Sequence, residues 1–255
     1  MTEEVRFYRR YFSGSDLVSF NVVLQETDLW IGVDGKVYRR SLEQEVEEVM
    51  QKERCQLERY LAANPAFKNA MHPVSVNYSH EEPPAVVTHM VRASLTPRVG
   101  PMAAVAGTFA EIAGKYLVDR GADAVIVENG GDIFLYTTQT RRIGIYAGKS
   151  PLSGRIGLEI SPEDTPLGIC TSSGTVGHSF SRGRADAVIV LAPSVPLADA
   201  AATALGNLVQ DKHDVEAVVQ RGGELEGISG VLAICEDRMA AWGNVRLCKL
   251  SSLEN

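Results

Sequence analysis

Residues 121–138 read GADAVIVENGGDIFLYTT, and this stretch decides the fold that the sequence predicts. Two runs rich in β-branched and aromatic residues flank the triplet Asn129, Gly130 and Gly131. Such runs favour β-strands, and the triplet tolerates the positive φ angles of a tight turn. The stretch therefore predicts two consecutive strands that are joined by a hairpin turn.

Around this hairpin the sequence predicts an α+β protein with mixed, largely antiparallel sheets. Alternating apolar residues predict two or three strands within residues 7–37, and residues 85–93 are predicted to form another strand. Residues 41–62 place apolar side chains on one helical stripe. Two segments rich in alanine and glycine, 102–121 and 196–209, predict helices that pack closely against the sheet.

The composition is that of a soluble globular chain of 255 residues, 45% hydrophobic and 22% charged. A formal net charge of -7 disfavours nucleic acid and anionic membranes as partners. The first residues lack the basic start and apolar core of a signal peptide, and no apolar segment is long enough to span a bilayer. The four cysteines form no CxxC pair and are expected to be reduced thiols. These features predict a cytoplasmic protein.

The turn at Asn129, Gly130 and Gly131 allows two interpretations. It is either a tight hairpin turn and nothing more, or a turn that faces a ligand. In the second case the glycines let a flat ring or a phosphate group approach backbone N–H groups. Asp132 follows the turn directly and is a candidate for proton transfer.

A second candidate site is the segment CTSSGTVGHSF at residues 170–180. Hydroxyl groups and backbone N–H groups around a glycine suit phosphate oxygens. The residues that would supply them are Thr171, Ser172, Ser173, Gly174 and Thr175. His178 titrates near neutral pH and is the other candidate for proton transfer. The alternative is a loop whose hydroxyl groups satisfy its own backbone.

Helical spacing brings further polar residues together. Asp199 and Thr203 are four residues apart and share one helix face, where two oxygen ligands suit a hard cation such as Mg²⁺. The same spacing also fits a carboxylate that stabilises the start of its helix and a self-satisfied threonine. Glu111, Lys115 and Asp119 also recur every four residues, which predicts a solvated helix face with ion pairs.

Five short motifs occur in the order found in the ApbE superfamily, the FAD:protein FMN transferases. They are IAGKYLVD (112–119), ENGGDI (128–133), CTSSG (170–174), GHSF (177–180) and LADAAATAL (197–205). The chain therefore resembles this superfamily over roughly residues 100–210. The resemblance predicts a single ApbE-like domain over residues 1–255, in which the N-terminal strands and helix of residues 1–95 lie outside the motif-bearing core.

The resemblance implies roles for several of these residues. Asp199 and Thr203 fall on the family's Mg²⁺ ligands. Residues 129–132 and 171–174 fall on segments that line the cleft for FAD or FMN, and His178 falls on the histidine after the Thr-Ser-Gly segment. Family members continue with Asp-Pro-Arg-Thr-Gly, where this chain has SFSRGRAD. The chain thus resembles the divergent, uncharacterised cytoplasmic branch, whose members have been linked to sulfide assimilation in anaerobes.

Two functions follow from the resemblance. The first is a Mg²⁺-dependent enzyme that binds a flavin or another nucleotide pyrophosphate and transfers or cleaves across it. The second is a non-catalytic binding or assembly protein, in sulfide assimilation, that keeps the fold and the cleft. In both cases the partner is a small-molecule nucleotide. The sequence leaves the oligomeric state open, a homo-oligomer included.

Overall fold

The computed structural model describes residues 16–75, 82–175 and 183–250. Eight strands form the larger sheet: β1 (Leu17–Leu24), β2 (Thr27–Asp34), β3 (Ala124–Asn129), β4 (Asp132–Thr137), β7 (Leu167–Ser172), β8 (Ala187–Ala192), β9 (Gly230–Cys235) and β10 (Arg238–Gly243). Three strands form the smaller sheet: β5 (Arg141–Gly144), β6 (Ile156–Ile160) and β11 (Leu247–Lys249). The strand orders are β1-β2-β3-β4-β7-β8-β9-β10 and β11-β6-β5.

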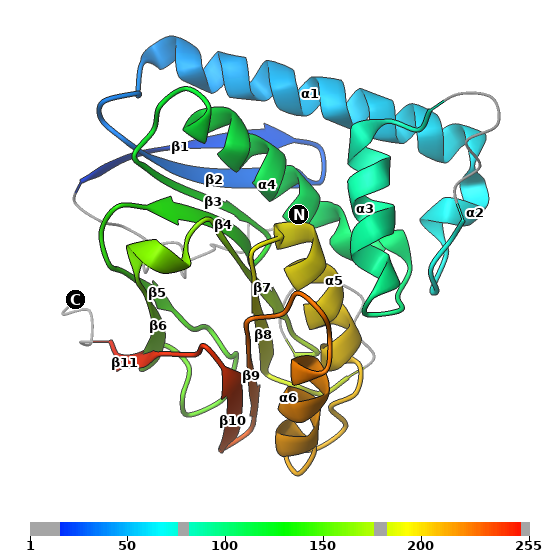
Figure 1. Ribbon diagram of the computed structural model, residues 1–255, viewed down its shortest axis with the longest axis vertical. Coiled ribbons are helices and arrows are strands. Elements are labelled where there is room, and N and C mark those ends of the chain that lie inside the picture. The colour runs from blue at the N-terminus through cyan, green and yellow to red at the C-terminus, as the bar shows by residue number, and fades with distance from the viewer. Residues whose placement is uncertain (1–15, 76–81, 176–182, 251–255) are drawn as a thin grey trace.

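The helices are α1 (Arg40–Ala63), α2 (Pro65–Lys68), α3 (Ala85–Leu95), α4 (Val105–Val118), α5 (Val195–Gly206) and α6 (Val215–Gly223). Short 3₁₀ helices span Pro101–Ala104 and Pro162–Asp164. The helices cover one face of the larger sheet, and the smaller sheet lies against the other face (Figure 1). All strand pairs within the described residues are antiparallel, which confirms the predicted α+β class.

The hairpin predicted at 121–138 is confirmed. β3 and β4 pair from Ala124 opposite Thr137 to Asn129 opposite Asp132. Gly130 and Gly131 form the turn with φ angles of 67° and 106°, the left-handed region that glycine adopts without strain. The helix predicted at 41–62 corresponds to α1, whose buried stripe faces the sheet.

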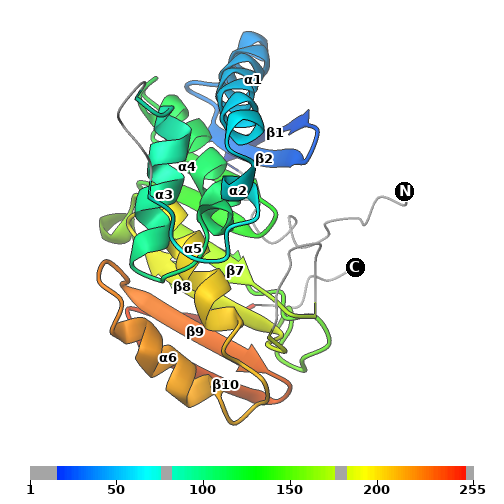
Figure 2. The same ribbon diagram turned by 90° about the vertical axis from the view of Figure 1, so that its right-hand side faces the viewer.

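The strand predicted at 85–93 is wrong, because this segment forms the helix α3. Its valines favour a strand by intrinsic propensity. However, the buried residues recur with helical spacing: Val86, Val87, Met90, Val91, Ala93 and Ser94. Burial of one continuous stripe outweighs a propensity difference of about 1 kcal/mol or less per residue. Helix α6 was not predicted from the sequence. It buries a similar stripe of apolar residues against β9 and β10 (Figure 2).

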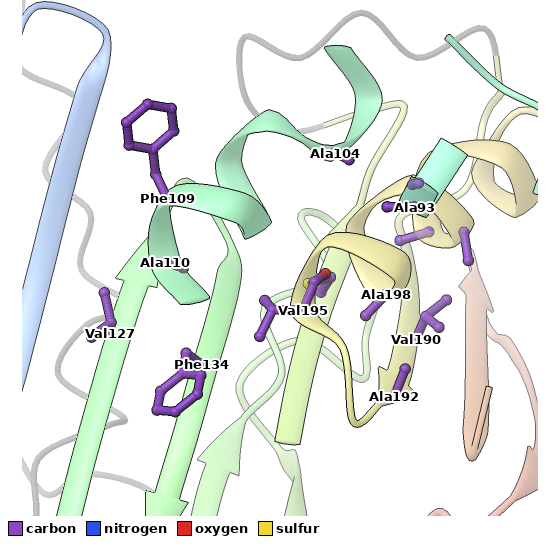
Figure 3. Packing of buried hydrophobic residues seen from close by; sticks show 14 of the residues in the cluster. Ala93, Ala104, Phe109, Ala110, Val127, Phe134, Val190, Ala192, Val195 and Ala198 are labelled. Carbon is purple, nitrogen blue, oxygen red and sulfur yellow. The ribbon is translucent and has the colours of Figure 1, made fainter. Parts of the chain in front are cut away.

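Small residues let α4 and α5 lie close to each other and to the sheet. A methyl group added at Gly107 of α4 would lie 2.8 Å from Cβ of Asp199 and 2.8 Å from the carbonyl oxygen of Val195, both on α5. Figure 3 shows Ala110 on α4 with Phe134 below it, and Ala198 on the side of α5 that faces the sheet. The close approach brings polar atoms of the two helices within hydrogen-bonding distance.

Within the part of the chain that the structure describes, no helix is both long enough and apolar enough to cross a membrane.

Gly107→Val tests the close approach of the two helices. The added side chain would collide with the backbone of α5, so we expect a loss of about 2–3 kcal/mol in the free energy of unfolding. Thermal denaturation should then show a Tm lower by roughly 5–10 °C. Gly35→Val is the control, because nothing lies within 4 Å of the added group there. Equal effects of the two substitutions would contradict the packing argument.

Candidate functional site

Helices α4 and α5 cap each other through two buried carboxylates. Glu111 of α4 accepts a hydrogen bond from the backbone N–H of Val195, the first residue of α5, at 2.8 Å. Asp199 of α5 accepts one from the backbone N–H of Gly107 at 2.8 Å and another from that of Ala106, in the first turn of α4. The first N–H groups of a helix have no partner within it, and negative charge is favourable there. Each carboxylate therefore fixes the start of the other helix.

The prediction that Glu111, Lys115 and Asp119 form a solvated face on α4 is wrong for Glu111. Its ion pair with Lys115 is present, but the Glu111 side chain is buried and only Lys115 and Asp119 reach solvent. The four-residue spacing predicted the ion pair correctly. It could not reveal the second helix, because the bond to Val195 spans 84 residues of sequence.

Asp132 is a third buried carboxyl group, and it lies beside Asp199. It is the first residue of β4 and pairs with Cys170 of β7. The backbone N–H of Thr171 donates a hydrogen bond to its carboxylate, and the Cys170 thiol lies beside that carboxylate and donates to the carbonyl oxygen of Val195 at 3.5 Å. Asp132 and Asp199 are each only 7% exposed. Among the described residues, no basic side chain forms an ion pair with either of them.

Burial governs the protonation of both aspartates. Burial raises the pKa of Asp199 to about 7, although the N–H groups of Gly107 and Ala106 act in the opposite direction. Burial raises the pKa of Asp132 well above its ordinary value, and the neighbouring charges of Asp199 and Glu128 add to that effect. Two close carboxylates in an apolar setting cannot both ionise easily. The pair thus lacks a positive partner within the described chain.

The glycine turn directs its polar groups inward. The N–H of Gly131 donates to the fully buried carboxylate of Glu128 at 2.7 Å. The side-chain amide of Asn129 donates to the carbonyl oxygen of Ala106 at 3.1 Å. Asn129 therefore links the turn to the same first turn of α4 that Asp199 caps. A methyl group at Gly131 would lie 3.6 Å from the carbonyl oxygen of Thr171, so the turn also lies beside the end of β7.

The segment after β7 satisfies much of its own backbone. Thr171 and Ser172 end the strand, and the N–H of Gly174 donates to the carbonyl oxygen of Ala185 at 2.9 Å. The N–H of Thr175 donates to Oγ of Ser173 at 3.1 Å, and the Thr175 hydroxyl donates to Asp186 at 3.0 Å. Two of the predicted N–H donors are therefore already in use. His178 lies outside the described residues.

The two predicted cation ligands lie on one helix. Asp199 is buried on α5, and Thr203 is partly buried four residues later, one turn along the same face. No group of three or more histidine, cysteine, aspartate or glutamate side chains suited to a metal occurs in the described parts of the chain. Mg²⁺ nevertheless takes few protein ligands and completes its shell with water and phosphate oxygens. The carboxylates of Asp132 and Asp199 and the hydroxyl of Thr203 fit that chemistry.

The structure thus brings together Asn129, Asp132, Asp199 and the end of β7. No role was predicted from the sequence for Cys170, Glu128 or Gly107. Glu128 had a visible signal, because it stands directly before the glycine turn. Cys170 and Gly107 act through neighbours far along the chain, which no local pattern could show.

This arrangement of helices and antiparallel sheets occurs in solved flavin transferases. The flavin transferase ApbE from Vibrio cholerae matches with a TM-score of 0.59 and 16% identity over 89% of this chain and 96% of that one. The apbe protein from Thermotoga maritima matches with a TM-score of 0.56 and 14% identity over 88% and 96% of the two chains. At such low identity the likeness shows the fold alone.

Sequence relatives are found among archaea. A "UPF0280 protein" of Methanosarcina acetivorans is 41% identical over 223 residues, 87% of this chain and 85% of the relative. Another from Methanocaldococcus jannaschii is 38% identical over 229 residues, 88% and 90% of the two chains. The family described as "AbpE bacteria" matches residues 9–239. The chain belongs to this ApbE-like family, as the resemblance of its motifs predicted.

Asp199→Asn tests how much the buried carboxylate of Asp199 lowers the free energy of unfolding. A carboxyl group whose pKa is raised to about 7 by folding makes no contribution below the unfolded-state pKa of about 4. Between about pH 4 and pH 7 the unfolded chain loses this proton before the native state does, so the native state loses stability over that range and the full cost is present above pH 7. The amide oxygen can still accept the bond from Gly107. We expect the free energy of unfolding to rise by on the order of 2 kcal/mol at pH 8 and to change little at pH 4.

Urea denaturation at the two pH values measures this difference. Glu47→Gln, an exposed carboxylate on α1, is the control and should change little at either pH. If Asp199→Asn instead lowers the stability at pH 8, the carboxylate acts mainly as a charged helix cap.

Proposed function

We propose that this protein binds a flavin nucleotide, or another nucleotide with a pyrophosphate, together with Mg²⁺. The site would lie where β4, β7 and the first turn of α4 meet α5. The observation that carries the proposal is the buried pair of carboxyl groups of Asp132 and Asp199, with which no basic side chain of the described residues forms an ion pair. Keeping two such groups costs stability, which is common where function requires a strained site.

Asp199 and Thr203 would hold the cation, with Asp132 beside them. A bound Mg²⁺ would offset the charge of a pyrophosphate and of a leaving phosphate. The reciprocal caps support this role, because they hold Asp199 at the first turn of α4 and limit its movement. Positioning of this kind is what a site for charge stabilisation needs.

The nucleotide would contact the turn at Gly130 and Gly131 and the segment from Thr171 to Thr175. Because the N–H groups of Gly131, Gly174 and Thr175 are already bonded, hydroxyl groups become the better candidates for phosphate contacts. The partly buried Thr171 is the first of these, since the turn lies beside it. The lack of side chains at the glycines leaves room for a flat ring.

Asp132 is the candidate for proton transfer. Its raised pKa favours a neutral carboxyl group, which can donate a proton to a leaving phosphate oxygen. The hydrogen bond from the backbone N–H of Thr171 would orient that carboxyl group. His178 remains the second candidate, from its place in the sequence.

The reaction class is proposed from the relatives. Solved proteins of the same fold are named flavin transferases, and the chain belongs to an ApbE-like family. We therefore propose a transferase, or an enzyme that cleaves the pyrophosphate. The absence of the Asp-Pro-Arg-Thr-Gly run after His178 favours a second candidate, a binding protein without turnover.

Titration calorimetry with FAD, FMN and ADP, with and without Mg²⁺, tests the binding site. We expect binding that depends on Mg²⁺ and is at least about tenfold weaker in Asp199→Asn and in Thr203→Val, which each remove a ligand oxygen or its charge. Glu47→Gln should bind as the wild type does.

Asp199→Asn is informative because the same variant is expected to be more stable, so weaker binding cannot reflect unfolding. Binding without Mg²⁺, or equal binding by wild type and both site variants, would contradict the proposal. Chromatography of the FAD mixture then tests for hydrolysis of the pyrophosphate, in which water is the acceptor and FMN and AMP are the products. FMN together with AMP indicates the cleaving enzyme, and intact FAD excludes hydrolysis. A transferase would release AMP only when its acceptor is also present.

A further inference from the structure

A cavity lies at the N-terminal end of α5, away from Thr203. It has a volume of about 220 Å³ between α3, α4 and the start of α5. Its lining residues are His89, Arg92, Ala93, Thr96, Glu111, Ser194, Pro196 and Leu197. The two helices α3 and α5 lie side by side in both overall views (Figures 1 and 2). This volume is smaller than the roughly 300–1,000 Å³ of typical ligand pockets.

Hydrogen-bond donors dominate this cavity. His89 and Arg92 project from α3 three residues apart, so they lie on one face of that helix. Within residues 16–75, 82–175 and 183–250, no hydrogen bond or ion pair involves the side chain of His89, Arg92 or Thr96. Ser194 adds a hydroxyl whose oxygen accepts from the N–H of Leu197, which leaves its proton available.

The acceptors in the cavity are already in use. Glu111 is the only acidic residue of the lining, and its two oxygens accept from Lys115 and from the N–H of Val195. The ammonium group of Lys115 therefore offsets the charge of Glu111, which leaves the charge of Arg92 without an acidic partner in the lining. The site does not depend on the helix dipole, because Glu111 and Ser194 occupy the N–H groups of Val195, Leu197 and Ala198.

We propose that this cavity binds a small oxyanion, the carboxylate or phosphate group of a metabolite smaller than a nucleotide. Arg92 supplies paired N–H donors for two oxygens of the anion. His89, Thr96 and Ser194 supply single donors around it, and Pro196 and Leu197 form an apolar wall for the rest of the molecule. Arg92 and Lys115 together carry one more charge than Glu111 offsets, on a chain with a net charge of -7.

The proposal is independent of the nucleotide site. The cavity is built at the first residues of α5, whereas Asp199 lies about one turn and Thr203 about two turns further along the helix. Glu111 lines the cavity, and its link to the nucleotide site is that it caps the first N–H group of α5. Substitutions at Arg92 should therefore leave nucleotide binding unchanged.

Thermal denaturation of the full chain in sodium phosphate, against sodium chloride at equal ionic strength, tests the cavity. We expect phosphate at about tenfold above its Kd to raise Tm by roughly 2–5 °C. Arg92→Gln should remove most of that rise, and Arg92→Lys should retain part of it. Arg59→Gln, which neutralises an exposed arginine on α1, is the matched control and should retain the full rise.

Phosphate could also bind at the nucleotide site, so Thr171→Val is measured in parallel and should retain the rise. Sodium malonate in place of phosphate distinguishes a carboxylate ligand from a phosphate ligand. A larger rise in Tm with malonate indicates a carboxylate ligand, and a larger rise in Tm with phosphate indicates a phosphate ligand. The proposal is overturned if neither anion raises Tm, if Arg92→Gln and Arg59→Gln respond equally, or if Thr171→Val alone removes the rise.

Discussion

The exchange of carboxylate caps between α4 and α5 is the interaction on which the rest of the structure depends. Glu111 holds the first N–H group of α5, and Asp199 holds N–H groups in the first turn of α4. Both bonds require the helices to approach closely, which Gly107 permits. The same approach gives the candidate site its geometry, because Asn129 and Asp199 meet the same turn of α4.

The two caps differ in their consequences. Glu111 has a cationic partner in Lys115, so its burial is compensated within the chain. Asp199 has backbone donors but no ion pair among the described residues, and its neighbour is another buried carboxylate, Asp132. Unpaired buried charge is costly. This asymmetry is why Asp199, rather than Glu111, is the better candidate for a ligand of a cation.

The sequence predicted the elements that local patterns determine. The hairpin at 121–138 was predictable because strand-forming runs flank two glycines, and α1 because its apolar residues follow one stripe. The helix α3 was missed because its valines favour a strand locally, and only burial of its apolar stripe against neighbouring helices such as α5 decides otherwise. Local pattern and tertiary packing conflict in that segment, and packing prevails.

The candidate site was predictable in part. The motifs indicated Asp132 and Asp199, and the structure places both in one buried region. Their protonation, however, depends on burial and on each other, which no spacing in the sequence reveals. The segment from Ser173 to Thr175 was expected to offer N–H groups, yet its bonds to Ala185 and Asp186 depend on a strand that follows later in the chain.

Anomalous scattering from a crystal grown with Mn²⁺ and FAD would test the central claim most directly. Mn²⁺ replaces Mg²⁺ at oxygen ligands and is visible at its absorption edge. We predict a peak bonded to side-chain oxygens of Asp199 and Thr203, with Glu111 still accepting from the N–H of Val195. A peak at Glu111, or ordered FAD with no peak at Asp199, would contradict this claim.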